Sequence, residues 1–200
     1  MFTGLIERMG TVRDLRDGAT ARRLSILSPN WPPSPQLGES IAIDGCCLTL
    51  VEADGAVLSF DAIPQTLART TLSGWTSGRR VNLERSATPT TLLGGHMVQG
   101  HIDGTGRVLS VQRSGEWRVR ISAPEEVAPY LVPRGSIAVD GVSLTVAAVQ
   151  EGSFDVCLIP ETLARTTLGA WSEGTLVNLE ADAIAKLVDA SVRRALGRAP

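Results

Sequence analysis

Two histidines, His96 and His101, lie in one glycine-rich stretch that spans residues 94–106. Their spacing of five residues keeps them off a common helix face, so the pair does not resemble a helical metal site. Imidazole titrates near neutral pH and suits general acid or base catalysis. His101 sits in a turn between Gly100 and Gly104, where backbone can approach a ligand closely. A general base at His101 is one hypothesis and a structural histidine near a turn is the other; the pattern favours a structural role for His96.

Two adjacent cysteines, Cys46 and Cys47, are the other candidates for chemistry. Neighbouring side chains on a strand point to opposite faces, so one thiol would enter the core while the other faces a cleft. The alternative is that both are small buried hydrophobic residues. Cys157 is far from this pair, and the spacing matches neither a disulfide framework nor a zinc site.

The sequence contains an internal duplication with a shift of 96 residues. Residues 40–50 match residues 136–146 at seven of eleven positions, and residues 63–72 match residues 159–168 at nine of ten. Two copies are too few for a solenoid, which needs several stacked units. We therefore expect two similar small domains followed by a helix, with these bounds: residues 1–96, residues 97–183, and residues 184–200 for the C-terminal helix and tail.

The duplication separates the roles of the two adjacent cysteines. Cys47 is aligned with Ser143, whereas Cys46 is aligned with Val142. The first position carries a polarisable or protic group in both copies, and the second is expected to be a core position. Two further residues share the outward face of the first position because they follow it by two along the strand: Thr49 and Thr145.

Composition excludes several classes of function. The formal net charge of −2 over 200 residues argues against a nucleic-acid-binding protein, which would carry a basic patch and stacking aromatic residues. No stretch approaches the roughly 18 apolar residues of a membrane span, and the first residues lack the apolar run of a signal peptide. We expect a cytoplasmic protein whose partner is a small molecule or another protein.

Short strands separated by turn residues are the main structural pattern. Asp-Gly pairs between apolar runs favour antiparallel hairpins, and the proline-rich run of residues 28–35 is expected to be a loop. Many short strands in each half favour a barrel or a sandwich. Residues 1–15 are assigned only as a short apolar segment. The expected strands are residues 22–27, 40–43, 47–51, 57–62, 79–83, 118–122, 136–139, 143–149, 153–159 and 175–179.

Two helical segments are expected besides the strands. Residues 63–72 and their repeat, 159–168, suggest one or two helical turns; they are either a simple helix start capped by threonine or a shared ligand site. The C-terminal segment has no counterpart in the first half and carries an apolar stripe at helical spacing. This stripe packs either on the barrels of its own chain or on the same helix of another subunit. Its members are Ile184, Leu187, Val188, Val192, Ala195 and Leu196.

Several long motifs in this order resemble the riboflavin synthase alpha-chain family. They are Met-Phe-Thr-Gly-Leu-Ile-Glu at residues 1–7, Gly-Cys-Cys-Leu-Thr at 45–49, Gly-Gly-His-Met-Val-Gln-Gly-His-Ile-Asp-Gly at 94–104, and Asp-Gly-Val-Ser-Leu-Thr at 140–145. The resemblance covers nearly the whole chain and implies an all-β fold of two six-stranded Greek-key barrels and a C-terminal helix that assembles a homotrimer. It also implies dismutation of two molecules of 6,7-dimethyl-8-ribityllumazine into riboflavin and 5-amino-6-ribitylaminouracil, with no cofactor and no metal. An association with lumazine synthase is a further implied partnership.

The resemblance implies a site in each repeat, with the active site formed by the first barrel of one subunit and the second barrel of its neighbour. The implied catalytic residues are His101, Cys47, Ser143 and Phe2, the last packing on the bound ring. The implied substrate-binding residues of the first half are Gly4, Leu5, Ile6, Ser40, Cys47, Leu48, Thr49, Asp61, Ala62, Ile63, Pro64, Gln65 and Thr66. Those of the second half are His101, Ile102, Asp103, Arg134, Ser143, Leu144, Thr145, Cys157, Leu158, Ile159, Pro160, Glu161 and Thr162.

The implied reaction gives the duplication a purpose, because two copies of one fold offer two similar pockets for two identical molecules. The C7 methyl group of the lumazine is acidic, and His101 is the hypothetical base for its proton or for a nucleophile adding at C7. That nucleophile is Cys47, Ser143 or water. Two departures from the family pattern are Arg134, where lysine is expected, and Gln65, where glutamate is expected.

Two rival functions follow from the same residues. Relatives in luminous bacteria carry a lumazine or flavin as a fluorophore without catalysis; they would be expected to lose site residues that are present here. A flavin-dependent oxidoreductase would need a nucleotide-binding βαβ unit with a glycine fingerprint, and the sequence contains none.

Overall fold

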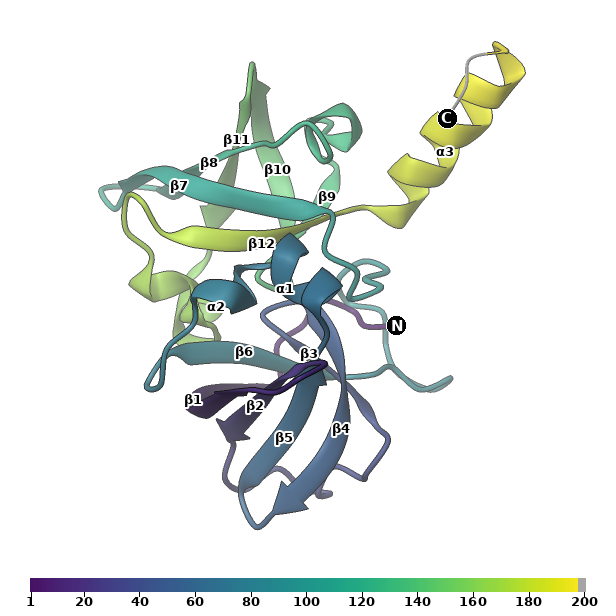
Figure 1. Ribbon diagram of the computed structural model, residues 1–200. Coiled ribbons are helices and arrows are strands. Elements are labelled where there is room, and N and C mark those ends of the chain that lie inside the picture. Colours follow the sequence, from purple (N-terminus) through teal and green to yellow (C-terminus); the bar gives the residue numbers. More distant parts are fainter. Residues whose placement is uncertain (198–200) are drawn as a thin grey trace.

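The computed structural model describes residues 1–197, which form two β-barrels and a terminal helix (Figure 1). None of the helices in this part of the chain is long and apolar enough to cross a membrane. The first barrel contains β1 (Arg8–Asp17), β2 (Arg22–Leu27), β3 (Ser40–Ile43), β4 (Cys46–Asp54), β5 (Val57–Ala62) and β6 (Arg80–Arg85). The second contains β7 (Gly104–Gln112), β8 (Trp117–Ser122), β9 (Ser136–Val139), β10 (Val142–Gln150), β11 (Ser153–Leu158) and β12 (Leu176–Ala181).

Both barrels have the same strand order. The first closes in the order β1-β2-β5-β4-β3-β6, and the second closes in the equivalent circular order β7-β8-β11-β10-β9-β12. All neighbouring strands are antiparallel. Closure leaves no strand edge unpaired. The expected pair of six-stranded barrels is confirmed, and the barrel rather than the sandwich is the correct alternative.

Each barrel has its own apolar core, built by alternation along the strands. On β4, Cys46, Leu48 and Leu50 point inward and are buried, whereas Cys47 and Thr49 point outward. Burial raises the pKa of the Cys46 thiol to about 12, so this cysteine stays a protonated core side chain. The prediction that Cys46 is a core position is confirmed.

Strands β1 and β7 were not predicted from the sequence, because each contains an internal glycine that weakens the strand pattern. Gly10 lies in β1 and Gly106 at the same place in β7. In the fold a side chain at Gly10 would place its Cβ 2.6 Å from Ile26, and one at Gly106 would lie 2.7 Å from the Ser122 carbonyl. The two glycines therefore permit close strand packing.

The hairpins between β3 and β4 and between β9 and β10 face each other at the contact of the two barrels. Both use Asp-Gly turns with positive φ at both residues, 43° and 80° in one and 45° and 79° in the other, as the sequence predicts. A Cβ on Gly45 would lie 2.7 Å from the backbone nitrogen of Gly141. The hairpin before β5 differs from expectation, because Gly55 and Ala56 form its turn and Asp54 ends β4.

Short helices follow the fifth strand of each barrel. These are α1 (Pro64–Arg69) with the 3-10 turn η1 (Thr71–Gly74), and α2 (Pro160–Arg165) with η3 (Thr167–Ala170); a third 3-10 turn, η2, spans Ala128–Tyr130. No threonine side chain caps the start of α1 or α2, and proline occupies the first helical position instead. Both helices lie between the barrels in Figure 1.

The C-terminal helix α3 (Ala183–Ala195) projects away from the barrels (Figure 1). Its apolar stripe is exposed: Ile184 by 59%, Leu187 by 68% and Val192 by 51%. The interpretation that the stripe packs on the barrels of its own chain is therefore wrong. Of the expected tail, residues 198–200 lie outside the described residues.

Candidate functional site

The start of each repeat crosses to the barrel of the other repeat. The two crossing segments meet at a β-bridge between Phe2 and Val98. Beyond it, the backbone N–H of Ser143 donates to the Gly4 carbonyl (2.8 Å), and the N–H of Cys47 donates to the Gly100 carbonyl (2.9 Å). Cys47 and Ser143 are thus each covered by a segment from the other repeat.

Glycine is required at both crossings. Gly4 and Gly100 have φ values of 74° and 82°, which L side chains rarely adopt. A Cβ on Gly4 would lie 2.6 Å from the Cβ of Ser143, and one on Gly100 would lie 2.5 Å from the Cβ of Cys47. The backbone therefore runs directly over the Cys47 and Ser143 side chains.

Buried carboxylates fix the two crossing segments. Glu84 accepts hydrogen bonds from the backbone N–H groups of Thr3 and Gly4 (2.6 and 3.0 Å). Glu180 accepts in the same way from Gln99, Gly100 and His101 (2.6, 2.9 and 3.1 Å). Burial raises the pKa of Glu180 to about 7, against the opposing effect of these N–H groups.

The first pocket is a cavity of about 230 Å³ over the outward face of β4. It combines Cys47 from β4, Gln65 and Thr66 from α1, and His101 from the crossing segment, with Arg69 at the end of α1. His101 is exposed and Cys47 is half-buried. The fold brings these residues, which were expected at the site, to one cavity, and His101 reaches it from the other repeat.

The related position over β10, where Ser143 is half-buried, is named the second pocket only because the repeat places it opposite the first. Ser143 takes the place of Cys47, and Leu5, which is 48% exposed, takes the place of His101. Its histidine is His96 instead, whose Nδ1 lies 2.7 Å from the Oγ of Ser143. Burial lowers the pKa of His96, with the nearby Asp182 carboxylate acting in the opposite direction. The two related positions therefore each bring together one histidine and one thiol or hydroxyl, in different arrangements.

The helix beside each pocket differs in charge. Arg165 forms an ion pair with Glu161 (3.3 Å) one turn earlier in α2. In α1 the matching residues are Arg69 and Gln65, so no carboxylate is available at this place. The departure at Gln65 leaves the first pocket with an additional positive charge.

Other predicted site residues occupy three kinds of position. Four inward-facing residues belong to the barrel walls and are buried: Leu48, Ala62, Leu144 and Leu158. Residues at or beside the pocket-bearing faces are Ile6, Ser40, Thr49, Ile63, Pro64, Ile102, Thr145, Ile159, Pro160 and Thr162. Two lie on β5 and β11 in charged clusters: Asp61 pairs with Arg23 (2.5 Å), and Cys157 lies beside Glu116 and Arg118.

Three predicted residues have other partners than expected. Phe2 is 1% exposed and packs between the barrels with Ala42, Val98 and Ala138, so its ring is not presented to either cavity within this chain. Asp103 accepts from Lys186 Nζ at 2.8 Å and ties α3 to the second barrel. Arg134 is an exposed loop residue with a φ of 68°.

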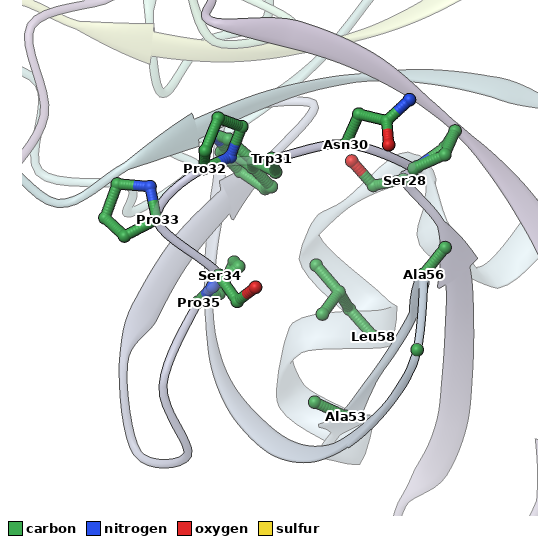
Figure 2. Close-up of a pocket in the computed structure, with 12 residues that line it drawn as sticks. Ser28, Asn30, Trp31, Pro32, Pro33, Ser34, Pro35, Ala53, Ala56 and Leu58 are labelled. Carbon is green, nitrogen blue, oxygen red and sulfur yellow. The ribbon is translucent and has the colours of Figure 1, made fainter.

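A larger cavity, of about 690 Å³, lies at the far end of the first barrel (Figure 2). The proline-rich loop forms one side of it, with Ser28, Trp31 and Pro35, and Leu58 forms part of the floor. None of the predicted site residues lines this cavity. Among residues 1–197, no group of three or more His, Cys, Asp or Glu side chains is arranged to hold a metal ion.

The residue that sequence analysis undervalued is His96. Its partner Ser143 is 47 positions away, so the chain gives no local sign of the contact. The buried Glu84 and Glu180 were detectable in principle, because a glutamate at the same place of two apolar strands is unusual.

Family and sequence comparisons agree on the duplication. The model of the lumazine binding domain matches residues 3–86 and again residues 99–182. The riboflavin synthase of Mycobacterium tuberculosis is 45% identical, with 98% of this chain and 100% of the relative covered. That of Chlamydia muridarum is 39% identical over 97% and 96%, and that of Brucella abortus is 39% identical over 93% and 95%.

Solved structures with the same fold contain related ligands. LumP complexed with 6,7-dimethyl-8-(1'-D-ribityl)lumazine matches with a TM-score of 0.80 and 26% identity, over 90% of this chain and 99% of that chain. LumP complexed with riboflavin matches with a TM-score of 0.81 and 27% identity over the same shares.

Proposed function

Because the chain belongs to the lumazine binding domain family, we propose that it is an enzyme that catalyses riboflavin synthesis. Two molecules of 6,7-dimethyl-8-ribityllumazine react, and one gives four carbon atoms to the other. The products are riboflavin and 5-amino-6-ribitylaminouracil. Together they contain the same atoms as two substrate molecules, so the reaction needs no external oxidant or reductant.

The observation that supports this function best is the pair of related but unequal side-chain arrangements over β4 and β10. A dismutation needs two positions for identical molecules that perform different roles, donor and acceptor. The first pocket provides Cys47 and His101, and the second provides Ser143 and His96. Holding two reactants in a productive orientation can lower the activation barrier by roughly 7 to 11 kcal/mol.

The first pocket is the proposed place of proton abstraction. The C7 methyl proton of the lumazine is acidic because the resulting anion delocalises into the ring. His101 is the base in this proposal: its imidazole is exposed to the cavity while three backbone N–H groups that include its own are held by Glu180. Cys47 and Ser143 are the candidate nucleophiles for addition at C7, with water as the alternative.

The active site is proposed to combine pockets from two subunits. Within one chain the helix α3 exposes an apolar stripe, and such a stripe must be covered in a stable assembly. The exposed stripe supports a homotrimer in which it packs against neighbouring subunits and the first barrel of one subunit meets the second barrel of the next. A cytoplasmic location and an association with lumazine synthase are further parts of the proposal; co-sedimentation of the two proteins tests the second.

A non-catalytic carrier of a lumazine or flavin is the competing function. The structural similarity to the ligand-bound LumP structures favours it as the second candidate. The greater identity to riboflavin synthases over the full chain favours the enzyme.

The test is incubation of the untagged protein with 6,7-dimethyl-8-ribityllumazine alone. Absorbance and chromatography follow riboflavin and the pyrimidine product. Equal amounts of both without added cofactor are expected. Tight binding of the lumazine without product would contradict the proposal and favour the carrier.

A further inference from the structure

His96 forms a hydrogen-bonded pair with Ser143 in the second pocket. The Nδ1 and Oγ atoms are 2.7 Å apart, and the His96 side chain is largely buried, with 8% of the residue exposed. Its other ring nitrogen, Nε2, is buried and has no hydrogen-bond partner among the described residues. The histidine therefore has one partner, and that partner is a residue of the pocket.

The position of the imidazole hydrogen follows from the unpaired nitrogen. Burial lowers the pKa of His96, so its ring is neutral near neutral pH and carries one N–H. A hydrogen on Nε2 would be a buried donor without an acceptor, which costs roughly 1 to 3 kcal/mol. On Nδ1 the same hydrogen donates to Ser143. The Ser143 oxygen then acts as acceptor, and its own hydrogen is free to be donated to a ligand on the outward face of β10.

We propose that His96 is a positioning residue that fixes the Ser143 hydroxyl as a hydrogen-bond donor to an acceptor atom of the bound lumazine ring. This inference rests on the proposed function for the identity of the ligand. The specificity of the second pocket is then set by a histidine that does not itself touch the ligand.

The backbone around His96 is built for this contact. A Cβ on Gly95 would lie 3.0 Å from the Ser143 Oγ and 2.1 Å from the Thr3 carbonyl, so only glycine allows the segment to approach so closely. The N–H of His96 donates to the same Thr3 carbonyl (3.1 Å). His96 is thus held both by its backbone N–H and by its ring atom Nδ1.

The first pocket has a different arrangement. Among the described residues, Cys47 makes no side-chain hydrogen bond with a histidine, and His101 is exposed to solvent. Within residues 1–197, a buried histidine in contact with the outward-facing side chain is therefore found over β10 and not over β4.

The test compares His96→Asn with His96→Gln. The amide nitrogen of asparagine lies the same number of bonds from Cβ as Nδ1, whereas that of glutamine lies one bond further. Lumazine binding is measured by ligand fluorescence in the His101→Gln background, where turnover is slowed. We expect His96→Gln to weaken one of two binding steps about three- to tenfold and His96→Asn to retain the wild-type value within about twofold.

A double-mutant cycle with Ser143→Ala separates positioning from general damage to the fold. Once the hydroxyl is absent, His96→Gln is expected to have no further effect on binding. Equal losses in His96→Asn and His96→Gln, or an undiminished loss in the Ser143→Ala background, would overturn the proposal. The binding readout does not depend on product, so failure of riboflavin formation would contradict the proposed function and leave this test interpretable.

Discussion

The first pocket and the related position over β10 occupy the same place on two copies of one barrel, yet they combine a histidine with a thiol or hydroxyl in different ways. In the first, Cys47 shares a cavity with His101, which is exposed and free to meet a ligand. In the second, Ser143 is bonded to His96, which is buried. Duplication thus supplied two equal binding platforms, and a few side chains at the crossing segments made them unequal. An exposed imidazole, as at His101, suits the proposed proton transfer, whereas a hydrogen-bonded hydroxyl, as at Ser143, suits orientation of the partner molecule.

The largest expected effect comes from removing the accessible base. His101→Gln should lower kcat about 100-fold while the affinity for the lumazine changes little, because general base catalysis contributes about that factor or more. Steady-state riboflavin formation and fluorescence titration measure the two quantities.

The control for this variant is Leu5→Gln, at the related position of the second pocket. Leu5 is exposed, so glutamine is expected to be tolerated with less than about a threefold loss of turnover. Similar losses in both variants would contradict the unequal roles.

Replacing Ser143 by Cys should lower kcat/KM more than replacing Cys47 by Ser. Ser143→Cys replaces a good acceptor of the His96 hydrogen bond by a weak one. A loss of about tenfold in kcat/KM is expected, compared with about threefold for Cys47→Ser. A reversed order of these losses in parallel assays would show that Cys47 is the more constrained group.

The hairpins at the barrel contact differ in charge compensation. Asp44 accepts from Arg79 Nη2 at 3.1 Å, whereas the residue that the repeat aligns with Arg79 is the uncharged Thr175. Burial raises the pKa of Asp44 to about 6, and burial together with the Asp44 charge raises that of Asp140 well above its usual value. Because the folded state holds more protons than the unfolded state, stability contributed by these groups is complete at acid pH and is lost as pH rises through their folded pKa values.

Asp140→Asn should therefore stabilise the protein at alkaline pH. We expect Tm at pH 8 to rise by about 3 °C or more and the decline of Tm between pH 5 and pH 8 to flatten. Thermal unfolding at several pH values measures both. Asp44→Asn is the matched control and should gain less, since it leaves Arg79 without its partner. An unchanged pH slope in Asp140→Asn would refute this assignment.

The smallest effect is expected at the helices beside the pockets. Gln65→Glu would create in α1 the ion pair that Glu161 and Arg165 form in α2. Both partners of that pair are more than 60% exposed, so the new pair is worth about 0.5 kcal/mol or less. Lumazine KM should change by no more than about twofold. A tenfold change would show that position 65 contacts the ligand directly.

Sequence patterns predicted two repeated all-β domains, each a barrel or a sandwich, because strands and turns depend on local signals; the resemblance to a known family implied the barrels. Alternation fixed the outward face of Cys47, the Asp-Gly pairs fixed two hairpins, and the repeat aligned Cys47 with Ser143. The crossing of the segments could not be predicted, because it depends on closure of both barrels and on buried partners about 80 residues away. For the same reason Phe2 was expected on a ligand and lies between the barrels, and His96 was undervalued.

The most direct test of two unequal, cooperating pockets is complementation between damaged subunits. One variant carries His101→Gln in the first pocket, and the other carries Ser143→Phe, which fills the second. Mixed assemblies obtained by co-expression contain some sites with both pockets intact if the site joins two subunits. The account predicts riboflavin formation at roughly a quarter of the wild-type rate, far above either parent. Activity no greater than that of the separate parents would contradict it.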